Sequence, residues 1–296
     1  MMTIAIFGNT YNSAIVSHIE TIVNYLKDKN LRFLLHESLH PVLNQINADL
    51  QSRRKNTRIE LISGNDFSAD LALSIGGDGT FLNTASLIGA KPIPILGINI
   101  GRLGFLADVA DDEILKALDS VLKKDYIIEE RSLLHIQASD NSELDYPFAL
   151  NEVAVLKQDS SSMISIHTSV NGEAVHTYQA DGLLVSTPTG STAYSLSIGG
   201  PIVVPQAQSF ILAPVASHSL NVRPLIIPDS WSIELEVFSR SDSYLISLDG
   251  RSKVLDVSTK LRIAKADYTI KVVKQKDYTF FDTLKNKLMW GVDKRN

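Results

Sequence analysis

The sequence predicts two kinds of domain in one chain: an N-terminal α/β domain on a parallel sheet, and a C-terminal, antiparallel, β-rich domain. Short apolar runs alternate with helical patterns in the first third of the 296 residues. After about Glu129, strand-like segments dominate. Asn171-Gly172 separates two of them, and Asn-Gly in that position is the strongest short-range signal for a β-hairpin.

The N-terminal elements follow from apolar spacing. Strands are predicted at residues 3–7, 31–35, 59–62, 71–75 and 93–98. The first helix shows one apolar face, made of Ile15, Ile19, Ile22, Val23 and Leu26. Helical spacing recurs at 40–54 and from Phe81 to Ile88. Strands alternating with helices indicate a parallel sheet with helices on its faces.

The C-terminal elements are mostly short alternating segments. Strands are predicted at residues 163–170, 173–178, 231–238, 244–248, 253–257, 260–264 and 268–273, and a helix at 280–290. We place the domains at 1–115, 116–275 and 276–296, with the border between Leu106 and Glu129. The last segment is expected to be helical and to pack back on the N-terminal domain.

Composition excludes several classes of function. The formal net charge of −5 argues against a sequence-independent nucleic-acid binder, which needs a basic face. Cysteine is absent, which excludes disulfides, Cys-ligated metals and a thiol nucleophile. No apolar run reaches the ~18 residues of a membrane-spanning helix. We therefore expect a cytoplasmic protein with neither a nucleic-acid nor a membrane partner.

The loop Gly76-Gly77-Asp78-Gly79-Thr80 lies between a predicted strand and a predicted helix. Its glycines allow close approach of a ligand, and the helix N-terminus offers N–H groups to anions. The Asp78 carboxylate could hold Mg²⁺ or accept a proton from an attacking hydroxyl, as phosphoryl transfer requires. Thr80 is expected to cap the helix. The alternative is a structural turn in which Asp78 is the cap.

A second cluster lies in the β-rich half. Asp181-Gly182 leads to a segment rich in hydroxyls and glycines, residues 187–201, which also contains Tyr194. Hydroxyls suit sugars and amides, and Tyr194 offers a stacking face. The alternative is a polar loop that satisfies its own backbone. Asn151-Glu152 interrupts a strand pattern, which indicates either a functional site or a strand edge or bulge.

Together these segments resemble NAD kinases, the enzymes that convert NAD to NADP. The resemblance rests on residues 76–80, 97–106, Asn151-Glu152 and 181–201, with weaker matches at 212–214, 223–225 and Asp249-Gly250. Lipid kinases and phosphofructokinases share the Gly-Gly-Asp-Gly loop, whereas the segment at 187–195 is far more specific.

The resemblance implies that Asp78 is the catalytic carboxylate, near the 2′-hydroxyl of the adenosine ribose. The implied contacts to NAD come from Gly79, Asn151, Glu152, Asp181, Thr192, Ala193, Tyr194 and Ser197, and Arg251 is added as a candidate phosphate contact. ATP or polyphosphate is the implied donor. A divalent metal, Mg²⁺, would be held mainly by the nucleotide and is assigned no protein ligand. A site between the two domains and a homodimer or homotetramer are implied as well.

This chain departs from the family pattern at Gln179, Ser162 and Arg251, which leaves details of the pocket and of regulation open. Two rival functions are weighed. A lipid kinase would need a membrane-facing patch, and no basic amphipathic helix is found. A regulator that senses NAD(H) without chemistry is the other, and the intact Asp78 argues against it.

Overall fold

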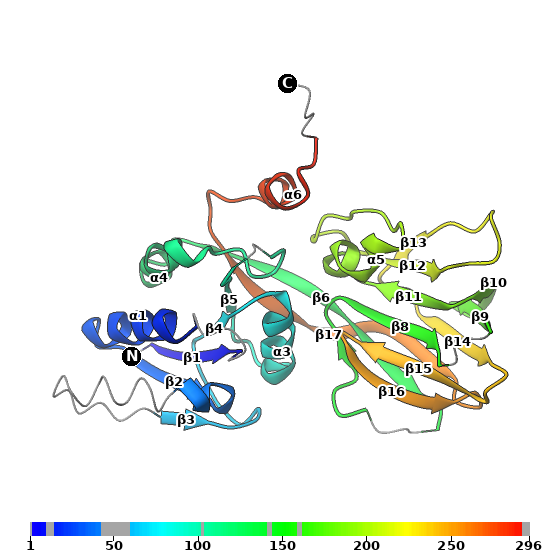
Figure 1. The fold of residues 1–296 in the computed structure, drawn as a ribbon, viewed down its shortest axis with the longest axis horizontal. Coiled ribbons are helices and arrows are strands. Elements are labelled where there is room, and N and C mark those ends of the chain that lie inside the picture. The colour runs from blue at the N-terminus through cyan, green and yellow to red at the C-terminus, as the bar shows by residue number, and fades with distance from the viewer. Residues whose placement is uncertain are drawn as a thin grey trace. The chain divides into compact units, whose positions relative to one another are not determined.

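The computed structural model describes residues 2–9, 15–42, 60–101, 104–140, 144–158 and 162–291. The chain divides into two compact units (Figure 1). Unit 1 contains the residues up to Glu130 and those from Ile270 onward, and unit 2 is Arg131–Thr269. The predicted fold class, a parallel α/β part followed by an antiparallel β-rich part, is confirmed.

Unit 1 is built on a parallel sheet whose strands run in the order β3-β2-β1-β4-β5. These strands are β1 (Thr3–Gly8), β2 (Arg32–His36), β3 (Glu60–Ile62), β4 (Leu71–Ile75) and β5 (Ile95–Ile98). The end of the long strand β17 (Leu261–Lys274) joins the sheet beside β5, where Val272 pairs with Ile95. The carboxyl end of β4 leads into the glycine loop at residues 76–80.

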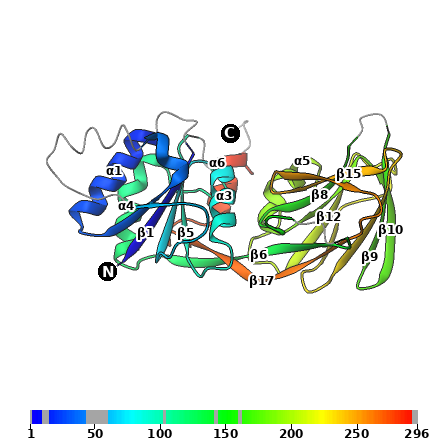
Figure 2. The same ribbon diagram turned by 90° about the horizontal axis from the view of Figure 1, so that it is seen from below.

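Helices cover both faces of this sheet. The helices of unit 1 are α1 (Ile15–Asp28), α3 (Asp78–Ile88), α4 (Ile114–Leu122) and α6 (Phe280–Leu288), with short 3₁₀ turns η1 (Glu37–Leu39) and η2 (Asp111–Glu113). α1 and α4 lie on one side and α3 on the other (Figure 2). The apolar face predicted for α1 is buried in an apolar cluster that also contains residues of β1, β2, β4 and α4. Of the predicted helix at 40–54, residues 43–54 lie outside the described part of the chain.

Unit 2 contains two antiparallel sheets. One has the order β10-β9-β14-β17, with β6 beside β17 and β7 beside β6, and the other has the order β13-β12-β11-β8-β15-β16. The strands are β6 (Ile127–Ala138), β7 (Phe148–Ala149), β8 (Glu152–Lys157), β9 (Ile164–Val170), β10 (Glu173–Ala180), β11 (Gly182–Ser186), β12 (Ser209–Val215), β13 (Leu225–Pro228), β14 (Ile233–Phe238), β15 (Ser243–Leu248) and β16 (Arg251–Asp256). Inward-facing side chains of both sheets form one apolar core.

The hydroxyl-rich segment forms η3 (Thr189–Thr192) and α5 (Tyr194–Ser197). It leads to Ile198 and Val203, which pack against a small apolar cluster containing Ala154 and Leu184. This cluster is separate from the main core and lies on β8, β11 and β12. The segment is thereby fixed beside the start of β8, where Glu152 lies.

Two local predictions have clear outcomes. The hairpin at Asn171-Gly172 is confirmed, since both residues have the positive φ of a type I′ turn, 50° and 79°. The separate strands predicted at 260–264 and 268–273 are wrong as a division, because they form the single strand β17. Among the described residues, no helix is both long and apolar enough to cross a membrane.

Candidate functional site

Asp78 is the first residue of α3, and its carboxylate is bound to a different segment of unit 1. Oδ2 accepts the main-chain N–H of Phe105 at 2.9 Å, while Oδ1 accepts those of Leu106 and Ala107 at 3.0 and 3.1 Å. The side chain is still 30% exposed. Three donors from consecutive residues hold the carboxylate in one position, with part of it open to a ligand.

Glycines make this arrangement possible. A Cβ on Gly104 would lie 2.0 Å from Oδ1 of Asp78, so only glycine lets the 105–107 segment approach so closely. Gly76 has φ +150°, and a Cβ there would lie 2.3 Å from Oγ1 of Thr80. The prediction that Thr80 caps α3 is wrong: Gly77 is the N-cap, and it makes no side-chain cap bond.

A lysine that sequence reasoning missed lies beside Asp78. Nζ of Lys287, in the last turn of α6, is 3.5 Å from Oδ2 of Asp78 and 4.5 Å from the ring centroid of Phe105. The ring of Phe280, the first residue of α6, is 6.4 Å from the same Phe105 ring. Nothing local distinguishes Lys287, because a cation near a helix C-terminus is ordinary.

A second aspartate carboxylate, in unit 2, is also bound by three main-chain N–H groups. Asp249 lies in the turn between β15 and β16 with φ 48°. Its carboxylate accepts the main-chain N–H groups of Leu150, Asn151 and Glu152 at 2.6, 2.9 and 3.1 Å. Burial raises the pKa of Asp249, and the three N–H donors oppose that effect. The sequence marked Asp249 only as a weak match, although it fixes the main chain of Asn151 and Glu152.

Glu152 is a buried carboxyl group of unit 2 with a raised pKa. Burial, followed by the nearby charge of Asp249, raises the pKa of Glu152 to about 7, and an N–H from Tyr194 opposes the rise. Oε2 of Glu152 is buried and has no hydrogen-bond partner among the described residues. A buried acceptor without a partner is costly, and such groups concentrate where ligands bind.

The segment at 187–201 packs closely against the main chain of Leu150 and Asn151. The Thr187 hydroxyl donates to the Leu150 carbonyl at 2.6 Å and accepts the N–H of Gly190 at 3.1 Å. A Cβ on Gly190 would lie 2.1 Å from the carbonyl oxygen of Asn151. The structure thus brings Asn151, Glu152 and this segment together, and the ring-bearing side chain of Tyr194 is 37% exposed.

Several predicted hydroxyls have local partners. Thr192 donates to the carbonyl of Thr189 at 3.3 Å, and Ser197 donates to that of Tyr194 at 2.8 Å. Their oxygens retain acceptor capacity, but their protons are directed to the segment itself. Ala193 joins η3 to α5. The alternative interpretation, a polar loop that satisfies its own backbone, therefore applies to these two hydroxyls.

Asp181 lies apart from this cluster, and the side chain of Arg251 is bound to main-chain carbonyls of another segment. Asp181 forms an ion pair of 2.7 Å with Lys157. Ladder pairs place it beyond the Leu156 end of β8, about 16 Å along the strand from Glu152. Arg251 donates to the carbonyls of Tyr146 and Phe148 at 2.7 and 2.6 Å. It holds the β7 segment that precedes Asn151.

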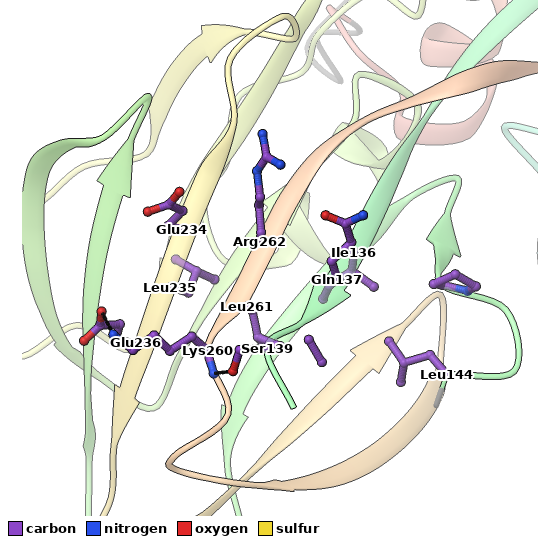
Figure 3. A pocket seen from close by; sticks show the side chains of 12 residues that line it. Ile136, Gln137, Ser139, Leu144, Glu234, Leu235, Glu236, Lys260, Leu261 and Arg262 are labelled. Atoms are coloured by element: carbon purple, nitrogen blue, oxygen red, sulfur yellow. Dashed lines mark hydrogen bonds and ion pairs between the residues drawn. The ribbon is translucent and has the colours of Figure 1, made fainter. Parts of the chain in front are cut away.

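Unit 2 also contains surface cavities away from these residues. One of about 570 Å³ lies on β6, β14 and β17 (Figure 3). Lys260 and Glu236 form an ion pair of 2.6 Å there, and Glu234 lies opposite Arg262 across the ladder. This mixture of charges provides no excess of positive charge for a phosphate. Gln179 and Ser162, two of the three departures from the family pattern, line another cavity together.

Both units match models of one protein family. Residues 4–126 match the ATP-NAD kinase N-terminal domain, and residues 150–275 match the ATP-NAD kinase C-terminal domain. A NAD kinase of Bacteroides fragilis is 50% identical over 99% of this chain and 100% of its own length. A NAD kinase of Cytophaga hutchinsonii is 43% identical over the full length of both chains.

Two solved structures are similar along nearly the whole chain. An NAD kinase from Archaeoglobus fulgidus in complex with ATP is 26% identical, with a TM-score of 0.75, covering 97% of this chain and 99% of its own. Yeast NADH kinase complexed with NADH has a TM-score of 0.88 at 24% identity, covering 99% and 89%, and this likeness concerns the fold.

Proposed function

Because the chain belongs to the ATP-NAD kinase family, we propose that it transfers the terminal phosphoryl group of ATP to the 2′-hydroxyl of the adenosine ribose of NAD. The products are NADP and ADP. The observation that carries the proposal is the Asp78 carboxylate, which three main-chain N–H groups hold at the junction of a strand, a glycine loop and a helix.

Asp78 is the proposed base. A carboxylate offers about four acceptor positions, and the N–H groups of residues 105–107 occupy three of them. One position remains for the 2′-hydroxyl, whose proton passes to Asp78 as the hydroxyl oxygen attacks the terminal phosphorus. The bond from that phosphorus to the bridging oxygen of ADP breaks in the same step. A fixed base reduces the reorganisation that transfer requires.

The proposed contacts to NAD are strongest at Glu152. Its unpartnered Oε2 can accept a ribose hydroxyl, which would satisfy a buried acceptor. Asn151 lies beside it, and the exposed ring of Tyr194 offers a stacking face. In unit 1, a Cβ on Gly79 would meet nothing within 4 Å, so a ligand can approach its backbone.

The remaining predicted contact residues have different roles in the proposed binding of NAD. Thr192 and Ser197 would act as acceptors, and Ala193 would present its main chain. Arg251 would act through the segment that it holds. Asp181 would have to contact NAD from the far end of the β8–β11 ladder, with Lys157 as its present partner.

The donor implies a divalent metal, for which Mg²⁺ is the expected ion. Among the described residues, no group of three or more His, Cys, Asp or Glu side chains could hold a metal ion. We propose that the metal is carried by the triphosphate, with few protein ligands. When bound, it would neutralise charge on the donor phosphates.

The decisive assay uses the purified chain with NAD, ATP and Mg²⁺ and follows NADP, with NADH and polyphosphate as parallel substrates. We expect NADP with ATP, and Asp78→Asn should lower kcat by about 10²–10⁴-fold while NAD still binds. NAD binding without NADP from either donor would indicate a sensor. Near-normal turnover of Asp78→Asn would refute the role of the carboxylate.

The assembly and the location belong to the proposal too. A homodimer or homotetramer is expected, and light scattering on the purified chain tests it. A cytoplasmic location is expected, and fractionation of cells tests it.

A further inference from the structure

We propose that Lys287 of α6 is a further catalytic residue, whose ammonium group contacts the terminal phosphoryl group of the donor during transfer. This inference rests on the proposed function and on the assignment of Asp78 as the base. It adds a positive group from the part of unit 1 that follows unit 2 in the sequence.

The contact between Lys287 and Asp78 is an incomplete ion pair. Nζ lies 3.5 Å from Oδ2, whereas a charge-assisted N–H···O bond measures about 2.7–2.9 Å. Oδ2 already accepts the N–H of Phe105 at 2.9 Å. The Phe105 ring, 4.5 Å from Nζ, attracts the ammonium by a cation–π interaction. The ammonium is thus kept near the carboxylate without being fully bound by it.

A permanent pair would serve the reaction badly. A Lys287 ammonium that stayed bound to Asp78 would compete with the 2′-hydroxyl for the acceptor position that remains on the carboxylate. The side chains of Lys287 and Asp78 are 32% and 30% exposed, so a ligand can reach both. If the ammonium moves to an arriving phosphoryl group, Asp78 is relieved of the cation as the hydroxyl approaches.

The distances allow that exchange. A general base lies about 2.6–3.2 Å from the hydroxyl whose proton it takes. The attacking oxygen in turn lies about 3–3.5 Å from the reacting phosphorus. The phosphoryl oxygens therefore arrive within reach of a flexible lysine that is already 3.5 Å from Asp78. Lys287 keeps its protons throughout and stabilises charge on the transferred group.

α6 carries a matched control. Lys285 and Lys287 both lie in its last turn, where any cation interacts favourably with the helix C-terminus. Hydrogen bonds from Thr279 lower the pKa of Asp282, in the first turn, and the positive charge of Lys285 lowers it further. A general effect of positive charge in this turn would thus appear in variants of both lysines. A contact with the phosphoryl group would appear at Lys287 alone.

The test measures binding of ADP and of an ATP analogue with an imido group between its β and γ phosphorus atoms, both with Mg²⁺. For Lys287→Met we expect the analogue to bind roughly 10- to 100-fold more weakly, the loss of one charged hydrogen bond. ADP affinity should change less than about threefold, because ADP lacks the contacted group. Lys285→Met should bind both as the wild type does, and Lys287→Arg should restore most of the analogue affinity.

Turnover and thermal unfolding are measured on the same proteins. Equal weakening of ADP and analogue, or analogue affinity of Lys287→Met equal to that of Lys285→Met, would overturn the inference. If Lys287→Met does not fold, Lys287→Gln is used, and the same ratio of ADP to analogue affinity decides. A wild-type chain that forms no NADP would refute the proposed function itself, whereas wild-type turnover with an unaffected Lys287→Met refutes Lys287 alone.

Discussion

Replacing Glu152 by Gln is expected to make the protein more stable above neutral pH while weakening its binding of NAD. Burial raises the pKa of Glu152 to about 7, from an ordinary value of 4.5. The folded protein thus binds this proton more tightly than the unfolded chain does. The associated stability is present below pH 4.5 and is lost as the pH rises through 7.

The structure sets the size of the effect. A difference of 7 − 4.5 = 2.5 in pKa corresponds to at most about 3.4 kcal/mol above pH 7. Gln cannot ionise, so Glu152→Gln removes this cost, and we expect a gain of about 1–3 kcal/mol at pH 8. Near pH 4.5 the two proteins should differ by less than about 0.5 kcal/mol. Asp249 is present in both proteins, and its charge is one of the causes of the raised pKa of Glu152.

Urea unfolding of both proteins at pH 4.5 and pH 8 provides the measurement, provided that the m-values agree. Equal dependence on pH in the two proteins, or a less stable Glu152→Gln at pH 8, would refute this account of the carboxyl group. Titration with NAD completes the test. The amide has one acceptor oxygen where the carboxylate has two, so affinity should fall about 5- to 10-fold at pH 8.

Two further predictions concern the stability of unit 1. Gly104→Ala should destabilise the fold by about 3 kcal/mol or more, because its Cβ would overlap Oδ1 of Asp78, whereas Gly77→Ala, with nothing within 4 Å, should cost less than about 1 kcal/mol. Thermal unfolding compares the two, and equal losses would contradict the overlap. Lys274→Met should lower the free energy of unfolding, measured in urea, by about 3–5 kcal/mol, because it leaves the buried carboxylate of Asp108 without its partner. A loss under about 1 kcal/mol would mean that water reaches the pair.

Local patterns were sufficient for much of the fold. Asn171-Gly172 specified its hairpin because the type I′ turn depends on two adjacent residues. The division of β17 was wrong because Lys265 and Asp267 lie within the strand and not in a turn between two strands. They are the exposed positions of a strand whose other face is buried, with Ala266 between them. The buried positions shift from Leu261 and Ile263 to Ala266 and Ile270, so the alternation changes phase within one continuous strand.

The site was less accessible to sequence reasoning because its partners are remote. Asp78 and Asp249 each accept three main-chain N–H groups, and a main-chain donor leaves no mark on residue type. Gly104 is the sequence feature that reflects the contact of Asp78 with residues 105–107, because a glycine there permits their close approach. Lys287 is 209 positions after Asp78 (287 − 78), and only the tertiary fold brings the two together.

The interrupted course of unit 1 has a consequence for synthesis on the ribosome. Residues from Ile270 onward belong to unit 1 but are translated after all of unit 2. Until they emerge, β5 lacks its β17 neighbour and Asp78 lacks the ammonium of Lys287. On the proposed assignments, a nascent chain acquires the Glu152 cluster before the Asp78 centre is complete. On the same assignments, the order of translation makes the dinucleotide contacts of unit 2 available before the phosphoryl-transfer centre is complete.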